Sequence, residues 1–136
     1  MTRVNHTELD FADDLLCLWH GEPFTGVACE YASNMALVSE VTYVDGMQTG
    51  MTREWYPSGQ LKMECEYLNG SKHGILREWF ESGHLEAEAS YEFSILTRKR
   101  TWDREGHLVG GFEISSKDPQ YSLLLTLRQG QARQQR

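Results

Sequence analysis

The sequence predicts a mainly β fold, an antiparallel up-and-down meander of 24-residue hairpin repeats that ends in a short helix. Three observations support this prediction: a 24-residue motif recurs, apolar and polar side chains alternate within each copy, and glycine-containing turns separate the alternating segments. No segment between the copies is long enough for a crossover helix, so consecutive strands must pair antiparallel. We expect a twisted sheet of about seven to nine strands.

Length and charge limit the classes of protein that fit. The 136 residues, 40% of them hydrophobic, suffice for one modest core, and we expect a single domain over residues 1–136, with the repeats in about 12–110 and a C-terminal segment in 111–136. The net charge of -7 is concentrated in residues 1–46, which hold eight acids and one base. This sign argues against direct nucleic acid binding. The acidic third either keeps the domain soluble or steers a basic partner.

The N-terminal segment is the first expected element. Residues 12–20 align in spacing with the ends of later repeats, which favours a strand. A short helix is the alternative, because apolar residues from Phe11 to Trp19 recur at helical spacing and Thr7 followed by Asp10 resembles a capping box. The segment lacks the pattern of a signal peptide, and no apolar run approaches the ~20 residues of a membrane span, so we expect a cytoplasmic protein without membrane contact.

The central repeats are the best-defined elements. The segment YVDGMQTGMTREWYPSGQLKMECE from Tyr43 aligns with YLNGSKHGILREWFESGHLEAEAS from Tyr67. Each copy reads as two strands and two turns. The dipeptides Asp45-Gly46 and Asn69-Gly70 accept the positive φ angles of hairpin turns. A degenerate copy precedes this pair, and a shortened copy follows it, as expected at the ends of a repeat array.

Alternation within the strands assigns side chains to two faces. One face, a candidate core, takes two equivalent sets of residues, and the charged side chains between them point the other way. Trp55 and Trp79 are expected to join this core, which would send their neighbours to the opposite face. The predicted core set is Leu61, Met63, Cys65, Tyr67, Leu85, Ala87, Ala89 and Tyr91.

The opposite face combines aromatic residues with carboxylates, as docking surfaces do. Its predicted members are Glu54, Tyr56, Glu64, Glu78, Phe80 and Glu88. Two alternatives stay open. Tyr56 and Phe80 could support strand pairing or lie under a terminal segment, and Glu64 and Glu88 could form a cross-strand ladder with Lys62 and neighbouring bases.

The C-terminal segment is predicted to hold a helix. Asp118-Pro119 is a favourable helix start, and an apolar stripe follows. We expect the helix to run from about Pro119 to Arg128 over one face or end of the sheet. The polar residues from Gln129 onward are expected to fray.

Catalytic and metal-binding patterns are weak. His84 and His107 occupy equivalent turn positions, but no spacing typical of zinc ligands occurs, and Cys17, Cys29 and Cys65 suit reduced structural thiols. No nucleophile motif or phosphate-binding glycine loop is present. We therefore expect no metal, no cofactor and no enzyme activity.

The repeat YxxGxxxGxxREWYxxGxLxxExxY resembles the MORN-variant repeats of YwqK-type antitoxin and immunity proteins, over about two thirds of the chain. The resemblance implies a meandering repeat sheet and a bacterial protein that binds and neutralises a cognate toxin. It carries no catalytic residues over, because the matching positions are structural. The first and last copies depart from the pattern by lacking several glycines.

Taken with the acidity, the resemblance predicts that the protein occludes the active site or substrate cleft of a toxin with a basic cleft. The expected contact residues are the six on the opposite face, with Asp10, Asp13 and Asp14 at the acidic end. The alternative is a MORN-like scaffold or membrane-surface module, although Arg98-Lys99-Arg100 is the only local basic run. Docking through a sheet face and pairing through an open edge strand both remain possible modes of binding.

Overall fold

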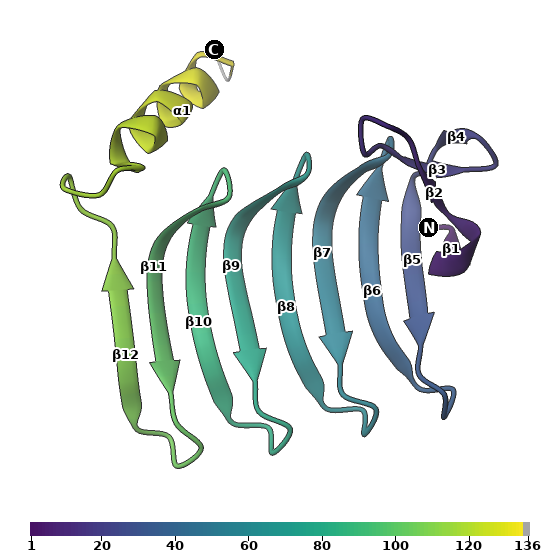
Figure 1. Cartoon of the computed structure of the whole chain (residues 1–136), viewed down its shortest axis with the longest axis horizontal. Coiled ribbons are helices and arrows are strands. Elements are labelled where there is room, and N and C mark those ends of the chain that lie inside the picture. The colour runs from purple at the N-terminus through teal and green to yellow at the C-terminus, as the bar shows by residue number, and fades with distance from the viewer. Residues whose placement is uncertain (135–136) are drawn as a thin grey trace.

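A curved nine-stranded sheet dominates the computed structural model, which describes residues 1–134 (Figure 1). From β5 to β12 each strand pairs antiparallel with the next, so the predicted meander is confirmed; β1 joins β5 in parallel, and β2 to β4 form a small separate sheet. The elements are β1 Arg3–Asn5, the 3-10 helix η1 His6–Glu8, β2 Asp10–Phe11, β3 Cys17–Trp19, β4 Glu22–Pro23, β5 Gly26–Tyr31, β6 Leu37–Val44, β7 Met47–Trp55, β8 Leu61–Leu68, β9 Ser71–Trp79, β10 Leu85–Glu92, β11 Ile95–Trp102, β12 Leu108–Glu113 and α1 Tyr121–Gln134.

Two-residue turns with positive φ at both positions join the strands at one end of the sheet. Such turns have the twist that suits flanking antiparallel strands, and the expected Asp-Gly and Asn-Gly turns are among them. The last turn uses Phe93 and Ser94, whose φ angles are 53° and 63°. Hydrogen bonds hold it, since the backbone N–H of Phe93 donates to Nδ1 of His73 and the N–H of Lys72 donates to Oγ of Ser94. The three turns of the large sheet are Asp45-Gly46, Asn69-Gly70 and Phe93-Ser94, and His20-Gly21 joins β3 to β4 of the small sheet in the same way.

The strand register defines two faces, because directly opposite residues share a face. The first, called here the cysteine face, buries Cys65, Leu76 and Ala89, which are 1%, 7% and 2% exposed. Met63, Tyr67, Tyr91 and Leu96 pack against them. Of the predicted core set this confirms Met63, Cys65, Tyr67, Ala89 and Tyr91, and Ala87 is buried as well, whereas Leu61 and Leu85 are half-buried and lie outside the cluster. The second, called the ladder face, carries Glu40, Arg53, Glu64, Arg77, Glu88 and Arg100 in one row of cross-strand neighbours.

The N-terminal segment forms neither of the two expected elements. Within residues 12–20 only Cys17–Trp19 is a strand, and it pairs with β2 and β4 instead of joining the large sheet. A capping box is present, but Asn5 and Glu8 form it around η1, so its assignment to Thr7 and Asp10 was wrong. The segment folds back over the first strands because its apolar residues are needed to cover that end of the array.

A second buried cluster holds the N-terminal segment in place, and residues 3–24 are called here the N-terminal cap. Val4, Cys17 and Phe24 form it, and Cys17 is 0% exposed. The backbone N–H of Cys17 donates to the carbonyl of Gly46 at 2.9 Å, and the N–H of Gly46 donates to the carbonyl of Phe24 at 2.8 Å. A Cβ on Gly46 would lie 2.6 Å from Cγ of Leu16 and 2.9 Å from the carbonyl oxygen of Cys17. Gly46 therefore serves both the turn and the attachment of the cap.

The C-terminal helix α1 lies beyond the end of the sheet that carries the two-residue turns (Figure 1). It begins at Tyr121 and continues to Gln134, so fraying from Gln129 was wrong over the described residues. Leu124 is 0% exposed, which anchors the helix by burial of one side chain. Arg128 donates two hydrogen bonds to the Glu92 carboxylate, at 2.9 and 2.6 Å, and this contact lowers the pKa of Glu92.

Replacing Gly46 by Ala should destabilise the protein more than replacing Gly70 by Ala. The two residues have φ of 83° and 87°, so the backbone cost of a Cβ, about 1 kcal/mol, is shared. Only Gly46 has atoms in the way; nothing lies within 4 Å of a Cβ on Gly70. Chemical denaturation should give Gly46→Ala an additional loss of about 1–3 kcal/mol. Equal losses of unfolding free energy in the two variants would show that the cap does not pack against Gly46.

Docking of α1 should weaken in acid. The folded pKa of Glu92 is below its ordinary value, so its contribution is complete above the ordinary carboxyl pKa of about 4.3 and is lost as pH falls through the folded pKa. The NMR methyl signals of Leu124 should report this loss. Glu92→Gln should weaken docking at neutral pH and remove this part of the pH dependence, whereas the exposed Glu81→Gln should change neither. Identical acid profiles for wild type and Glu92→Gln would contradict the assignment.

Candidate protein-binding surface

The predicted carboxylates divide between the two faces. Glu54 lies opposite Met63, and Met63 lies opposite Glu78, so these two acids share the cysteine face. Glu64 and Glu88 lie on the ladder face, each opposite Arg77. The expected placement of all four on one face was therefore wrong.

A β-bulge explains this error. Glu54 pairs with Met63 but Trp55 pairs with Leu61, so β8 advances two residues while β7 advances one. An extra residue in one strand shifts the alternation of side chains between the two faces by one residue. Glu54 was assigned to a face from the position of Leu61, across this bulge, and it therefore lies on the other face. The same shift recurs one repeat later, between Leu85 and Ala87 of β10. Trp55 and Trp79, beside these shifts, are half-buried and belong to neither buried cluster, contrary to the expected core positions.

A row of acids on the ladder face is paired with arginines of the same chain. Arg77 lies between two carboxylates, with its Nε donating to Oε2 of Glu88 at 2.9 Å and its Nη1 3.7 Å from Oε1 of Glu64. Arg53 approaches Glu64 at 3.5 Å, and Arg3 approaches Glu40 at 2.6 Å. The ladder that was the structural alternative for Glu64 and Glu88 is therefore present, with arginines as the bases.

The cysteine face carries a row of carboxylates without such partners. Glu30, Glu54 and Glu78 occupy equivalent positions of β5, β7 and β9, and Ser39 and Met63 lie between them. Among residues 1–134, the ion pairs do not include any of these three acids. Two strand spacings separate neighbouring acids by about 10 Å. Glu30 was missed by the sequence reasoning, although the repeat period places it beneath Glu54.

The N-terminal segment borders the same side of the sheet. His6, Leu9 and Phe11 line a hollow of about 220 Å³ with Glu30 and other residues of the cysteine face. A second hollow, about 530 Å³, lies between Phe11, Asp14, Leu15 and the start of β7. Both hollows share Phe11 and Tyr43. The acidic end and the carboxylate row thus belong to one continuous surface.

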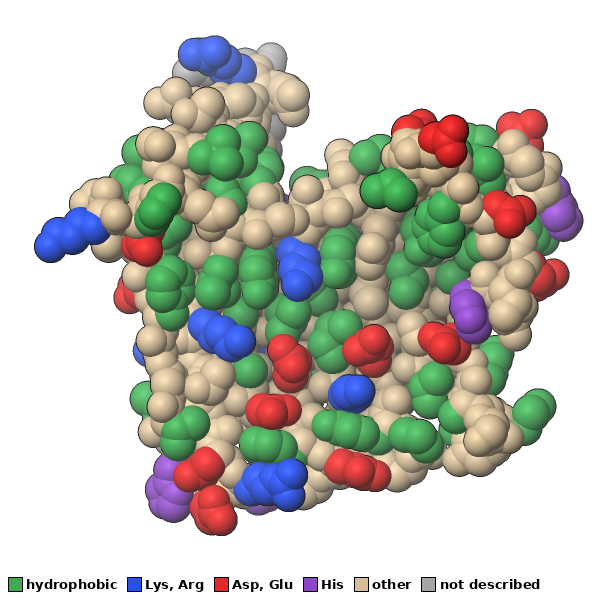
Figure 2. Space-filling model, viewed as in Figure 1, with side chains coloured by type: hydrophobic (Ala, Val, Ile, Leu, Met, Phe, Trp, Pro, Cys, Tyr) green, Lys and Arg blue, Asp and Glu red, His purple; other side chains and the backbone are tan. Residues whose placement is uncertain are grey.

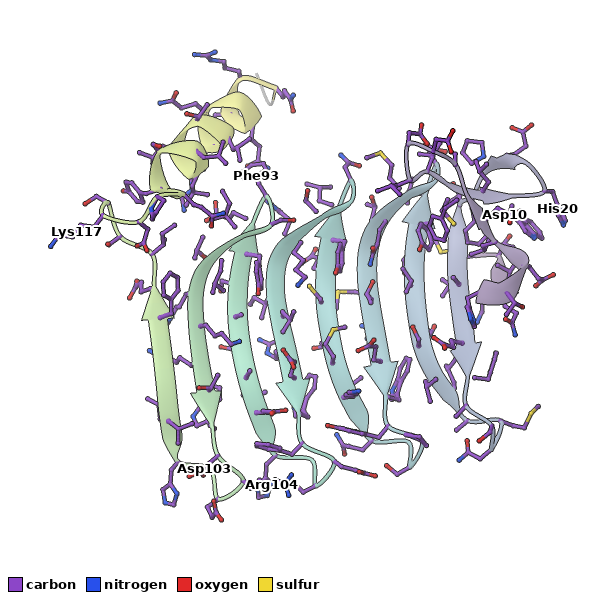
Figure 3. The ribbon with its side chains drawn as sticks, viewed as in Figure 1. Asp10, His20, Phe93, Asp103, Arg104 and Lys117 are labelled. Atoms are coloured by element: carbon purple, nitrogen blue, oxygen red, sulfur yellow. The ribbon has the colours of Figure 1, made fainter. Side chains whose placement is uncertain are left out.

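The predicted acids at this end differ in their surroundings. Asp14 accepts a hydrogen bond from the backbone N–H of Leu16 and lines the larger hollow, and Asp10 and Asp13 are exposed. Figure 2 shows carboxylates gathered over this end of the molecule, and Figure 3 shows Asp10 and His20 in the same region. Phe11 and Leu15 are 60% and 79% exposed, so large apolar side chains lie among the acids.

Tyr56 and Phe80 lie outside the sheet faces, at the turns that follow β7 and β9. The hydroxyl of Tyr56 donates to the carbonyl of Trp79 at 2.8 Å, which ties one turn to the next. The ring of Tyr56 lies beneath Lys62, and the ring of Phe80 lies beneath Arg104. These contacts support the structural alternative, in which both rings hold neighbouring repeats together.

The buried titratable groups are structural. Burial raises the pKa of Cys17 and Cys65, which keeps both thiols protonated and unreactive at neutral pH. Burial also raises the pKa of Tyr67, with a further contribution from nearby charges that include Glu54. A turn brings Asp103, Glu105 and His107 together, but Asp103 already accepts hydrogen bonds from the backbone of the other two.

This architecture defines a class of protein: a repeat sheet whose hairpins build extended surfaces around structural side chains. Residues 48–69 and 72–92 match the family described as MORN repeat variant. The chain is also 49% identical over 110 residues to a protein of Bacillus subtilis (strain 168) called "Immunity protein YwqK", an alignment that covers 81% of this chain and 71% of that protein. The chain therefore belongs to the MORN-variant repeat family of YwqK. No solved structure matches the chain, and no helix within residues 1–134 could span a membrane.

Removing charge from the carboxylate row should not cost stability, whereas removing it from the ladder should. Glu54→Gln eliminates an acid that forms no ion pair within residues 1–134, so the free energy of unfolding should be unchanged or slightly higher. Glu64→Gln, on the adjacent strand, leaves Arg53 and Arg77 without their shared partner and should cost about 0.5–1 kcal/mol. Thermal and chemical unfolding test this difference, and a larger loss for Glu54→Gln would assign that acid to the scaffold.

Proposed function

We propose that this protein is a non-catalytic immunity protein that binds a cognate toxin and covers its active site or substrate cleft. The carboxylate row Glu30, Glu54 and Glu78 carries the proposal, together with the relationship to an immunity protein. Within residues 1–134 these carboxylates form no ion pair, which leaves them available to a partner's lysines and arginines. On the opposite face, in contrast, Glu64 and Glu88 form ion pairs with arginines.

The chemistry of the surface suits a toxin with a basic cleft. A net charge of -7 accelerates encounter with a basic partner and orients it before contact. Phe11 and Leu15, exposed beside Asp14, would supply the apolar contacts that give such an interface most of its affinity. A row of carboxylates in a basic cleft would occupy the positions of substrate phosphates. We place the protein in the cytoplasm of the cell that it protects.

The charge distribution argues against the membrane-surface alternative. The basic run Arg98-Lys99-Arg100 does not form one patch, because Arg98 and Arg100 lie on the ladder face and Lys99 lies on the cysteine face. Arg100 is also directly opposite Glu88. A polybasic segment attracts anionic lipid only where several bases face it together.

Charge reversal on each face tests the proposed surface. The toxin probe is the product of the adjacent gene, with binding measured by calorimetry and protection measured by growth during co-expression. Glu54→Lys on the cysteine face should weaken the complex by about tenfold or more and reduce growth rescue. Glu66→Lys, an exposed site opposite Met51 on the ladder face, is the matched control and should change affinity less than about twofold. A loss confined to Glu66→Lys would overturn the assignment of the face.

A further inference from the structure

The two edges of the large sheet differ in what covers them. At the N-terminal end β1 pairs with β5, and the cap with Cys17 and Phe24 packs there. At the other end β12 pairs with β11 only, and α1 lies beyond the ends of the strands instead of beside β12 (Figure 1). Leu108 and Val109 are each 62% exposed and Phe112 is 40% exposed. An uncovered apolar edge strand of this kind is a template for pairing with another strand.

The backbone of β12 presents its free hydrogen-bonding groups at two positions. The N–H of Ile114 donates to the carbonyl of Thr97 at 2.8 Å, so this pair is hydrogen-bonded. Hydrogen-bonded and non-hydrogen-bonded pairs alternate in an antiparallel ladder. Phe112 therefore turns its backbone groups toward β11, whereas Gly111 and Glu113 turn theirs outward.

The ladder face ends in charges that an added strand could complete. The alternation of Glu88 and Arg100 stops at Gly111, which lies opposite Arg100 and has no side chain. Glu113, two residues further on, lies opposite Arg98. A hollow of about 520 Å³ surrounds the two glycines of the edge. Its lining includes Arg98, Lys99, Arg100, Gly110, Gly111 and Glu113.

We propose that β12 pairs antiparallel with β12 of a second copy, about a twofold axis that passes between the two Phe112 residues. In this register Gly111 of one copy lies opposite the partner's Glu113, and both residues have outward backbone groups. The carboxylate of the partner's Glu113 then enters the hollow above Gly111, next to Arg100. The two Phe112 rings meet on the cysteine face.

The second copy is the occupant that matches this edge. The edge requires a strand with an acid opposite Gly111 and an apolar residue opposite Phe112. The backbone groups of that strand must point toward β12 at the residues opposite Gly111 and Glu113. β12 meets all three requirements itself, which is the condition for an interface that a twofold axis can close. The pairing would join two nine-stranded sheets into one and extend the alternating row of charges across the axis.

Mass measurement across a concentration series tests the dimer. The wild type should reach twice the chain mass of 15.7 kDa in sedimentation equilibrium. Glu113→Lys places a base beside Arg100 of the other copy and should weaken association by about tenfold or more. Glu105→Lys, the same change at an exposed turn, should leave association unaltered. A wild type that stays monomeric, or a Glu113→Lys dimer as strong as the wild type, would overturn the proposal.

Cysteine crosslinking tests the register without relying on the charge variants. Phe112→Cys places two thiols across the axis at disulfide distance, whereas thiols from Val109→Cys would be separated by about 20 Å along the strands. The native Cys17, Cys29 and Cys65 are buried, so the new thiol reacts first. Phe112→Cys should form a covalent dimer under mild oxidation and Val109→Cys should not; equal crosslinking of both would reject this register. Neither assay contains toxin, so the result is independent of the proposed function.

Discussion

Strand register, fixed by the two-residue turns, is the constraint on which the rest of this structure depends. The buried cluster in the middle of the large sheet lies on the cysteine face, and a one-residue slip would move every side chain of a strand to the other face. Turns such as Asn69-Gly70 hold both residues at positive φ and align the strands that they join. Arg77 therefore meets Glu64 and Glu88, and Leu76 meets Cys65 and Ala89.

The same register makes the two faces electrostatically different. On the ladder face the acids of the central row, Glu40, Glu64 and Glu88, each form an ion pair with an arginine. On the cysteine face the acids at the period of the repeat, Glu30, Glu54 and Glu78, alternate with residues that carry no charge. The N-terminal cap adds Asp14 and Phe11 to the surface of the cysteine face. The register also places Lys72 and Lys99 on the cysteine face, so its acidic part is the row of Glu30, Glu54 and Glu78 with the N-terminal cap, and this part suits a partner that is basic.

The repeat made most of the meander predictable. Glycines at constant spacing located the turns, and alternation in β8 and β10 identified Cys65, Ala87 and Ala89 as core residues. The bulges were not predictable, because they depend on how two strands pair, and they moved Glu54 and Glu78 to the other face. The cap was also missed, since its strands are only two or three residues long and are held by contacts to a distant turn. The docking of α1 involves the contact of Arg128 with Glu92, a residue 36 positions away that the local sequence of the helix does not indicate.

The central claim is that a toxin docks on the cysteine face and its N-terminal cap. Hydroxyl-radical footprinting of the complex with the product of the adjacent gene tests this claim directly, because it reports which side chains lose contact with solvent. The account predicts protection of Phe11, Leu15 and Met63, with the ladder-face residues Met51 and Ile75 as reactive as in the free protein. Protection of Met51 and Ile75, with Phe11 and Leu15 unchanged, would contradict it.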